Sequence, residues 1–179
     1  MRLWTTRFAK TGIAIIRFKN NKPQILHTEL FITDKNKDGV ERISDTIEHI
    51  DKIRRKYKVD LTVKEGAIVG RASTSMPVHK AHGALEYYYF DNTLPLEEIH
   101  NATLKAYCRK YLIEKKFYTK DELKQFNKKE IVAEFLKAYF SSDMPEIYTK
   151  RGKLLDDVSD ACALSCYWFE NIYKEDDDN

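Results

Sequence analysis

Residues 10–33, with the sequence KTGIAIIRFKNNKPQILHTELFIT, decide which fold class we predict for this chain. Apolar and β-branched side chains dominate residues 12–18 and 25–33, which is typical of strands. Between them, Asn20-Asn21-Lys22-Pro23 contains the turn-forming residues of a hairpin. Together with residues 2–6, the stretch predicts three strands in meander order.

The hydrophobic period then changes from that of a strand to that of a helix. Over residues 38–57, apolar side chains recur every three or four positions opposite a charged face, and Asp38 is a suitable N-cap. Residues 59–63 return to a short apolar strand, as expected for a buried strand that enters the sheet after a helix.

The rest of the chain alternates between loops, helices and one short strand. The final helix is apolar nearly all round, so it should pack against the sheet. The order of elements predicts an α/β fold of RNase H-like arrangement, with a mixed five-stranded sheet flanked by helices. We expect a loop at 66–77, a helix at 79–90, a strand at 96–100, helices at 102–114 and 129–139 joined by a connecting segment at 117–128, and the final helix from about 157 to 173.

The composition is that of one globular domain. Of 179 residues, 42% are hydrophobic and 33% charged, and this length can bury a sizeable core. We expect a single domain over residues 1–174 and a disordered acidic tail at 175–179. No stretch is apolar enough to span a bilayer, and the first residues lack the layout of a secretory signal. This predicts a cytoplasmic protein with no membrane partner.

The three cysteines are expected to be reduced and buried. Cys162 and Cys166 lie one helical turn apart in an apolar run, which is core spacing and not the CxxC pairing of a zinc knuckle. With Cys108 they make an odd set, and we interpret all three as core thiols, not metal ligands.

Basic residues are unevenly distributed, although the net charge is only +3. One interpretation is a basic face for nucleic acid, and the other, which charge alone favours, is ordinary solvated helix faces. The basic segments are 54–56, 105–116, 120–129 and 150–153.

Three acidic residues form the candidate chemical site. Glu65 follows the strand predicted at 59–63, at the carboxyl edge of the sheet, where open α/β folds usually bind ligands. Asp157 and Asp160 are three residues apart at the start of the final helix and therefore share one face. Such carboxylates suit Mg²⁺, and two ions about 4 Å apart can drive phosphodiester hydrolysis. Each acid could instead act locally, at a helix start capped by Asp156 or in a loop.

Several segments resemble RuvC-type Holliday junction resolvases of the RNase H-like superfamily, with phage-encoded members closest in style. Residues 10–16 (KTGIAII) resemble the first hairpin of that family, and residues 63–66 (VKEG) resemble its second acidic site. Residues 155–164 (LDDVSDACAL) are similar to its C-terminal D-x-x-D-A-x-A signature. Residues 80–85 and 101–105 match the helix after the glutamate and the segment after the fifth strand.

The resemblance implies a crossover junction endodeoxyribonuclease, a Mg²⁺-dependent enzyme that resolves Holliday junctions and other branched DNA by paired nicks. Glu65, Asp157 and Asp160 would be its metal ligands, Mn²⁺ can substitute for Mg²⁺, and water would be the nucleophile. The family places a basic residue near the metals, and here Lys128 is the best positional match, followed by Lys105; either could instead be a solvated helix residue. The residues expected to contact DNA are Arg71, Lys80, Lys105, Arg109, Lys128 and Lys129.

Aromatic residues suggest an interface. Residues 87–90 (YYYF) cover all faces of their helix, so some must be exposed unless a second subunit covers them. The resemblance implies a homodimer, which would present two active sites to the opposed strands of a four-way junction. Stacking on an unpaired base is the alternative. His79 and His82 lie on the same helix, and we assign them no metal role.

One position departs from the family pattern. The alignment places Thr5 where the first-strand acid is expected, and Thr6 and Arg7 offer no substitute. In the family this acid contacts both metals, so its loss removes a charge that offsets the repulsion between two cations. An altered sequence, a weakened enzyme and a junction-binding protein without cleavage all remain open. Besides a nuclease and a junction-binding protein, a third class of function is an ATP-dependent, sugar-kinase-like protein. The short chain and the lack of a second glycine-rich phosphate loop argue against it.

Overall fold

A computed structural model describes residues 2–7, 10–66, 72–141 and 143–174 of the chain. Its strands form a mixed sheet in the order β3-β2-β1-β4-β5, in which β1, β2 and β3 are antiparallel neighbours and β4 and β5 run parallel to β1. The predicted mixed α/β architecture is confirmed. The strands are β1 (Arg2–Arg7), β2 (Lys10–Lys19), β3 (Lys22–Ile32), β4 (Thr62–Glu65) and β5 (Leu96–Ile99).

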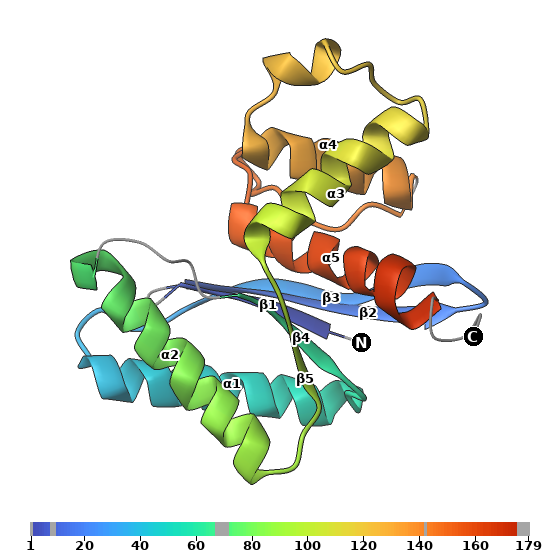
Figure 1. Cartoon of the computed structure of the whole chain (residues 1–179). Helices are drawn as coiled ribbons and strands as arrows, with labels where there is room; N and C mark the ends of the chain where they lie inside the picture. The colour runs from blue at the N-terminus through green and yellow to red at the C-terminus, as the bar shows by residue number, and fades with distance from the viewer. Residues whose placement is uncertain (1, 8–9, 67–71, 142, 175–179) are drawn as a thin grey trace.

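Helices cover both faces of this sheet (Figure 1). Two of them, α1 and α2, lie on one face, whereas α5 lies on the other face with α3 and α4 stacked beyond it. Among the described residues, no helix has the length and apolar character that crossing a membrane requires. The helices are α1 (Gly39–Tyr57), α2 (Ala72–Asp91), α3 (Asn101–Glu114), α4 (Lys128–Phe140) and α5 (Asp156–Trp168), with a 3-10 turn η1 (Glu122–Gln125) and a π-helical turn η2 (Phe169–Tyr173).

Two hydrophobic cores follow from the alternation of side chains along the strands. On β2, Ile13 and Ile15 pack in the core beneath α1 and α2, whereas Ala14 and Ile16 belong to the larger core with α3, α4 and α5. Cys108, Cys162 and Cys166 are free thiols buried in the larger core, as predicted.

The predicted hairpin and the first helix cap are confirmed. Asn20 and Asn21 join β2 to β3 with φ angles of 50° and 59°, a left-handed turn that asparagine tolerates. The Asp38 side chain accepts hydrogen bonds from the main-chain N–H groups of Val40 and Glu41, and the Glu41 side chain completes a capping box.

Two boundaries before the candidate site were predicted wrongly. Strand β4 begins at Thr62 and not at residue 59, because Lys58 ends α1 in a left-handed conformation and residues 59–61 lead from that cap to the sheet. Glu65 is therefore the last residue of the strand. Helix α2 begins at Ala72, inside the segment predicted as a loop, with Pro77 as its sixth residue. Proline removes one hydrogen bond, and the remaining turns of a 20-residue helix tolerate that loss.

The start of α5 also differs from the prediction. Asp156 is the first helical residue and not the cap; the N-cap position belongs to Leu155, whose side chain makes no capping hydrogen bond. The α-helix ends at Trp168, and η2 continues to Tyr173. This helix lies directly against β2, and its segment 157–166 is entirely buried, as the apolar pattern predicted.

Candidate metal and nucleic-acid site

Glu65 is held at the carboxyl edge of the sheet by pairing on the β5 side. Its Cα pairs with that of Ile99, and the N–H of Gly66 donates a 2.9 Å hydrogen bond to the carbonyl of Ile99. The carboxylate accepts a hydrogen bond from Nδ2 of Asn101, the first residue of α3. Both the strand and the following helix therefore fix this acid.

Asp157 and Asp160 are positioned by the close approach of α5 to β2. A Cβ on Gly12 would overlap the main-chain carbonyl of Asp157 and lie 2.7 Å from the nitrogen of Val158, so glycine permits the contact. Asp157 and Asp160 are each only 8% exposed in the folded chain. Buried carboxylates need a compensating charge or hydrogen bonds.

Burial is the main influence on Asp160. It raises the pKa of this carboxyl to about 6, and the negative charges of Glu65, Asp156 and Asp157 act in the same direction. The Lys105 ammonium, 3.7 Å from Oδ2, opposes the shift. The effect of Glu65 on Asp160 shows that the strand acid and the helix acids share one electrostatic environment.

The Oδ1 atom of Asp160 supports a cation at this place. It is buried and has no hydrogen-bond partner among the described residues. Such an atom is costly unless something satisfies it, and a carboxylate oxygen beside other carboxylates is a ligand that Mg²⁺ prefers. Glu65, Asp157 and Asp160 therefore fit a hard divalent cation by their chemistry.

The three acids are nevertheless not drawn into a tight ligand cage. In the part of the chain that the structure describes, a different group, His82, Glu86 and Glu98, has its ligand atoms all within 4.8 Å of one another.

The group formed by His82, Glu86 and Glu98 surrounds a lysine. Lys64, on β4 next to Glu65, has a side chain only 2% exposed and forms ion pairs with Glu86, at 2.9 Å, and with Glu98. Its Nζ also lies 3.4 Å from Nδ1 of His82, to which the sequence assigned no metal role. The ammonium thus already supplies a positive charge to this group, which lies on the opposite face of β4 from Glu65.

Two lysines approach the acids at the start of α5. Lys105 on α3 pairs with Asp160, and Lys129 on α4 pairs with Asp156. Lys128, the best positional match from the sequence, is the exposed first residue of α4. The contacts therefore favour Lys105 and Lys129 over Lys128 as the basic residues closest to the acids.

The other residues predicted to contact DNA either are exposed on helices or lie outside the described residues. Arg109 is exposed on α3, one turn after Lys105, and Lys80 is exposed on α2. Arg71 and the acidic tail at 175–179 lie outside the described residues.

Position 5 lies in the sheet between the two sets of acids. Thr5 pairs with Gly12, which contacts the start of α5, and β1 pairs with β4 up to Trp4 and Lys64. One residue further along both parallel strands lie Thr5 and Glu65. The register thus agrees with the alignment that assigned Thr5 to the position of the first-strand acid.

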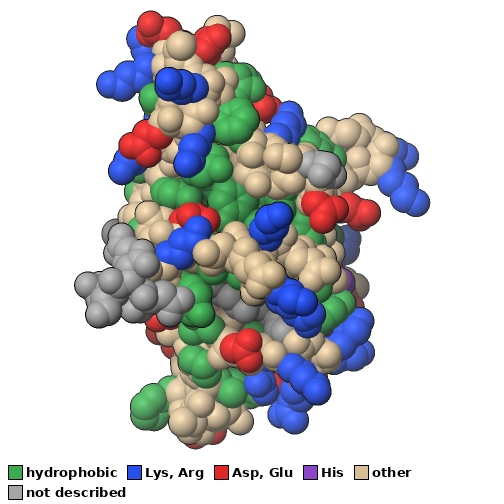
Figure 2. Space-filling model, turned by 90° about the vertical axis from the view of Figure 1, so that its right-hand side faces the viewer, with side chains coloured by type: hydrophobic (Ala, Val, Ile, Leu, Met, Phe, Trp, Pro, Cys, Tyr) green, Lys and Arg blue, Asp and Glu red, His purple; other side chains and the backbone are tan. Residues whose placement is uncertain are grey.

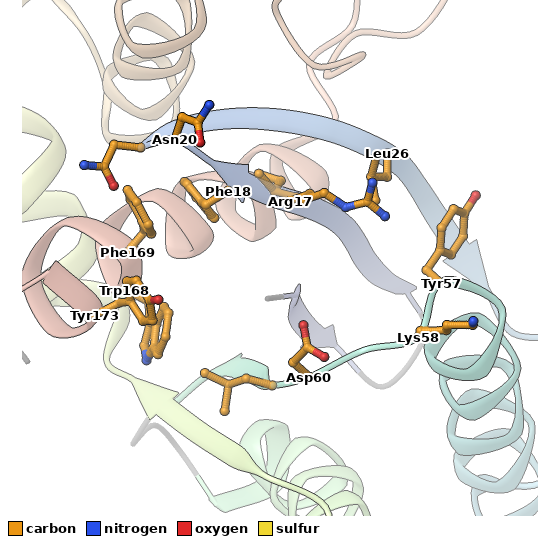
Figure 3. A pocket seen from close by; sticks show the side chains of 13 residues that line it. Arg17, Phe18, Asn20, Leu26, Tyr57, Lys58, Asp60, Trp168, Phe169 and Tyr173 are labelled. Carbon is orange, nitrogen blue, oxygen red and sulfur yellow. The ribbon is translucent and has the colours of Figure 1, made fainter. Parts of the chain in front are cut away.

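A cavity of about 500 Å³ lies at the end of the sheet opposite to the carboxyl edge that carries Glu65. Figure 3 shows Trp168, Phe169 and Tyr173 on one side of it and Tyr57 and Lys58 on the other. Figure 2 views the molecule from this edge, and lysine and arginine side chains gather in its lower right part, where α1 ends. None of the described residues lining this cavity is a predicted site residue, so it is separate from the acids.

The sheet order and the helices on both faces are similar to the fold of solved RuvC structures. Solved structures show the likeness. RuvC of Thermus thermophilus in complex with a Holliday junction substrate is 14% identical, with a TM-score of 0.67 over 96% of this chain and 97% of that chain. A second RuvC structure from that organism is 15% identical, with a TM-score of 0.65 over 95% and 96%.

The yeast mitochondrial Holliday junction resolvase Ydc2 is 10% identical, with a TM-score of 0.67 over 93% of this chain and 77% of that chain. No family model and no curated protein matches the sequence. The RuvC-like fold is thus confirmed from structure alone, and a kinship with phage-encoded members stays a prediction.

Sequence reasoning missed Asn101 and the Lys64 group. Asn101 contacts Glu65 across 36 positions, and Lys64 contacts Glu98 across 34. Lys64 directly follows the strand predicted at 59–63, and its sequence neighbours gave no signal of a buried ion pair. The signals for Asn101 were its place after the strand predicted at 96–100 and the resemblance of residues 101–105 to the family's segment after the fifth strand.

Proposed function

We propose that the protein is a metal-dependent endonuclease that resolves four-way and other branched DNA junctions by paired nicks. The observation that carries the proposal is Asp160, a buried acid with an unpartnered oxygen, surrounded by the charges of Glu65, Asp156 and Asp157. This group lies at the carboxyl edge of a fold shared with a RuvC that is bound to a Holliday junction.

In this proposal Glu65, Asp157 and Asp160 hold Mg²⁺, or Mn²⁺ in its place. Bound divalent cations would supply the Lewis acidity that activates the attacking water and stabilises the departing oxygen. The chain itself buries Asp157 and Asp160, and the Gly12 contact lets the start of α5 approach β2 closely. Lys105 and Lys129, which now pair with acids, would then be available to contact DNA phosphates.

We further propose that α1 and α2 form the interface of a homodimer. Tyr87 and Phe90 on α2 are 68% and 83% exposed, and Val40 on α1 is 77% exposed. A groove of about 450 Å³ between the two helices is lined largely by apolar side chains, among them Val40, Ile47 and Tyr87. Tyr89, in contrast, is a core residue whose hydroxyl is 3.0 Å from that of Thr62. A second copy would cover the exposed apolar surface and present two active sites to a junction.

The test is a nicking assay on a synthetic four-way junction with Mg²⁺, with Mn²⁺ and with a chelator. The proposal expects nicked duplexes only with metal, little cleavage of linear duplex, and loss of cleavage in Asp157→Asn. Asp143→Asn, an exposed acid after α4, is the matched control and should cut like the wild type. A wild-type protein that leaves junctions intact at every metal concentration would overturn the enzymatic part.

A second candidate function is junction binding without cleavage, and Thr5 is the observation that favours it. A neutral residue at the position between Gly12 and Glu65 leaves one carboxylate fewer for two cations. This candidate expects salt-sensitive binding to branched DNA that is the same with metal and with chelator. A filter-binding or gel-shift titration run beside the nicking assay separates the two functions.

A further inference from the structure

Helix α3 contacts both separated parts of the acidic site with two side chains on one face. Asn101 donates a hydrogen bond from Nδ2 to Oε1 of Glu65, and Lys105, four residues later, pairs with Oδ2 of Asp160. Residues four apart in a helix lie on the same side. The first turn of α3 therefore links the acid on β4 to the acid on α5.

Strand pairing and a main-chain hydrogen bond hold the backbone next to Asn101. Asn101 directly follows the N-cap residue His100, and the preceding strand residue Ile99 pairs with Glu65. Gly66, the residue after Glu65, is buried and hydrogen-bonded to the Ile99 carbonyl. The amide and the carboxylate thus extend from two neighbouring strand ends, and Asn101 itself is half-buried.

The chemistry of asparagine suits the task. An amide N–H orients a carboxylate without adding a positive charge, so the full charge of Glu65 remains for a cation. A lysine at the same place would add a positive charge, as Lys105 does beside Asp160. Hydrogen bonds of this kind fix the direction of metal ligands, and losing one typically costs about 10- to 100-fold in metal affinity.

We propose that Asn101 is a positioning residue that holds the Glu65 carboxylate in the orientation required to bind the divalent cation. The proposal rests on the metal-dependent function proposed above. It assigns to the start of α3 a role beyond packing, since one face of the helix orients one acid and neutralises another. It also predicts that the effect of Asn101 passes entirely through Glu65.

The test is Mn²⁺ binding to the full chain, measured by calorimetry without DNA. Asn101→Leu, which keeps the size and removes the amide, should weaken binding about 10-fold, and Asn101→Gln, which keeps a donor, should recover part of it. Asn92→Leu is the matched control because its amide donates to the Tyr88 carbonyl at the far end of α2. That variant should bind Mn²⁺ like the wild type.

A double-variant cycle separates positioning from general structural damage. If Asn101 acts through Glu65, then Asn101→Leu in a Glu65→Gln background should weaken Mn²⁺ binding no further. Metal-free melting temperatures check folding, and Asn101→Ser replaces the leucine variant if the latter does not fold. Two results would overturn the positioning role: losses of Mn²⁺ affinity that add in the double variant, or an unchanged Mn²⁺ affinity in Asn101→Leu. In either case, Mn²⁺ binding by the wild type would still support the metal site. If the wild type binds no Mn²⁺, the metal site fails and the positioning role fails with it.

Discussion

Gly12 on β2 and Asp157 on α5 are in direct contact, with the glycine backbone against the main-chain carbonyl of the aspartate. A side chain of any size at position 12 would meet that carbonyl, and its Cβ would lie 2.7 Å from the nitrogen of Val158. The distance between the sheet and the start of α5 is therefore set by the absence of a side chain. This contact fixes where Asp157 and Asp160 stand relative to Glu65.

Gly12→Ala should destabilise the protein by about 2 kcal/mol, because backbone on both sides of the contact must move. Urea unfolding monitored by circular dichroism measures the effect. Gly83→Ala is the control: Gly83 lies inside α2, and nothing is within 4 Å of a Cβ placed there. It should be stabilising by up to about 1 kcal/mol. Equal effects of the two alanines would contradict the packing described here.

Asp160→Asn should make the metal-free protein more stable at pH 8 but not at pH 4. The folded-state pKa of Asp160 is raised to about 6 from the usual 3.8, so the folded protein holds this proton more tightly than the unfolded chain. Stability therefore falls as pH rises from about 4 to about 6 and stays lower above that range. The loss, on the order of 2 kcal/mol, is absent from the asparagine variant. Urea unfolding across pH 4–8 with a chelator measures it, and a pH-independent difference would contradict the assignment.

Thr5→Asp should increase Mn²⁺ affinity and junction cleavage sharply. Position 5 pairs with Gly12 on β2, and the register between β1 and β4 places it opposite the end of β4, so an acid there would add a negative charge between the strand acid and the helix acids. Thr5→Asn is the control, since it adds a similar oxygen without a charge. Calorimetry and the nicking assay report the two effects. If the aspartate and asparagine variants behave alike, the assignment of position 5 is wrong.

Replacing both Tyr87 and Phe90 by aspartate should convert a dimer into a monomer, because charges would be buried in the proposed interface. Sedimentation velocity at several concentrations measures the change. Phe117→Asp serves as the control, because Phe117 is 51% exposed but follows α3 on the other side of the sheet. A wild-type protein that is monomeric at all concentrations, or a control that also dissociates, would count against this interface.

The sequence by itself determined the features that depend on neighbouring residues. Alternation along β2, the Asn20-Asn21 turn, the Asp38 cap and the buried segment 157–166 all follow from local periodicity and local hydrogen bonding. The boundaries that failed are the start of β4, which follows the left-handed Lys58 cap of α1, and the start of α2, which lies in a segment predicted as a loop.

Only the tertiary structure decided which side chains meet in the site. The contacts of Glu65 with Asn101, of Lys105 with Asp160 and of Gly12 with α5 join residues that are dozens of positions apart. No local pattern encodes such pairs, because they arise from the order in which strands lie in the sheet and from the depth at which α5 packs on it. The acids were visible in the sequence, but their common electrostatic environment depends on burial and proximity that only the folded chain creates.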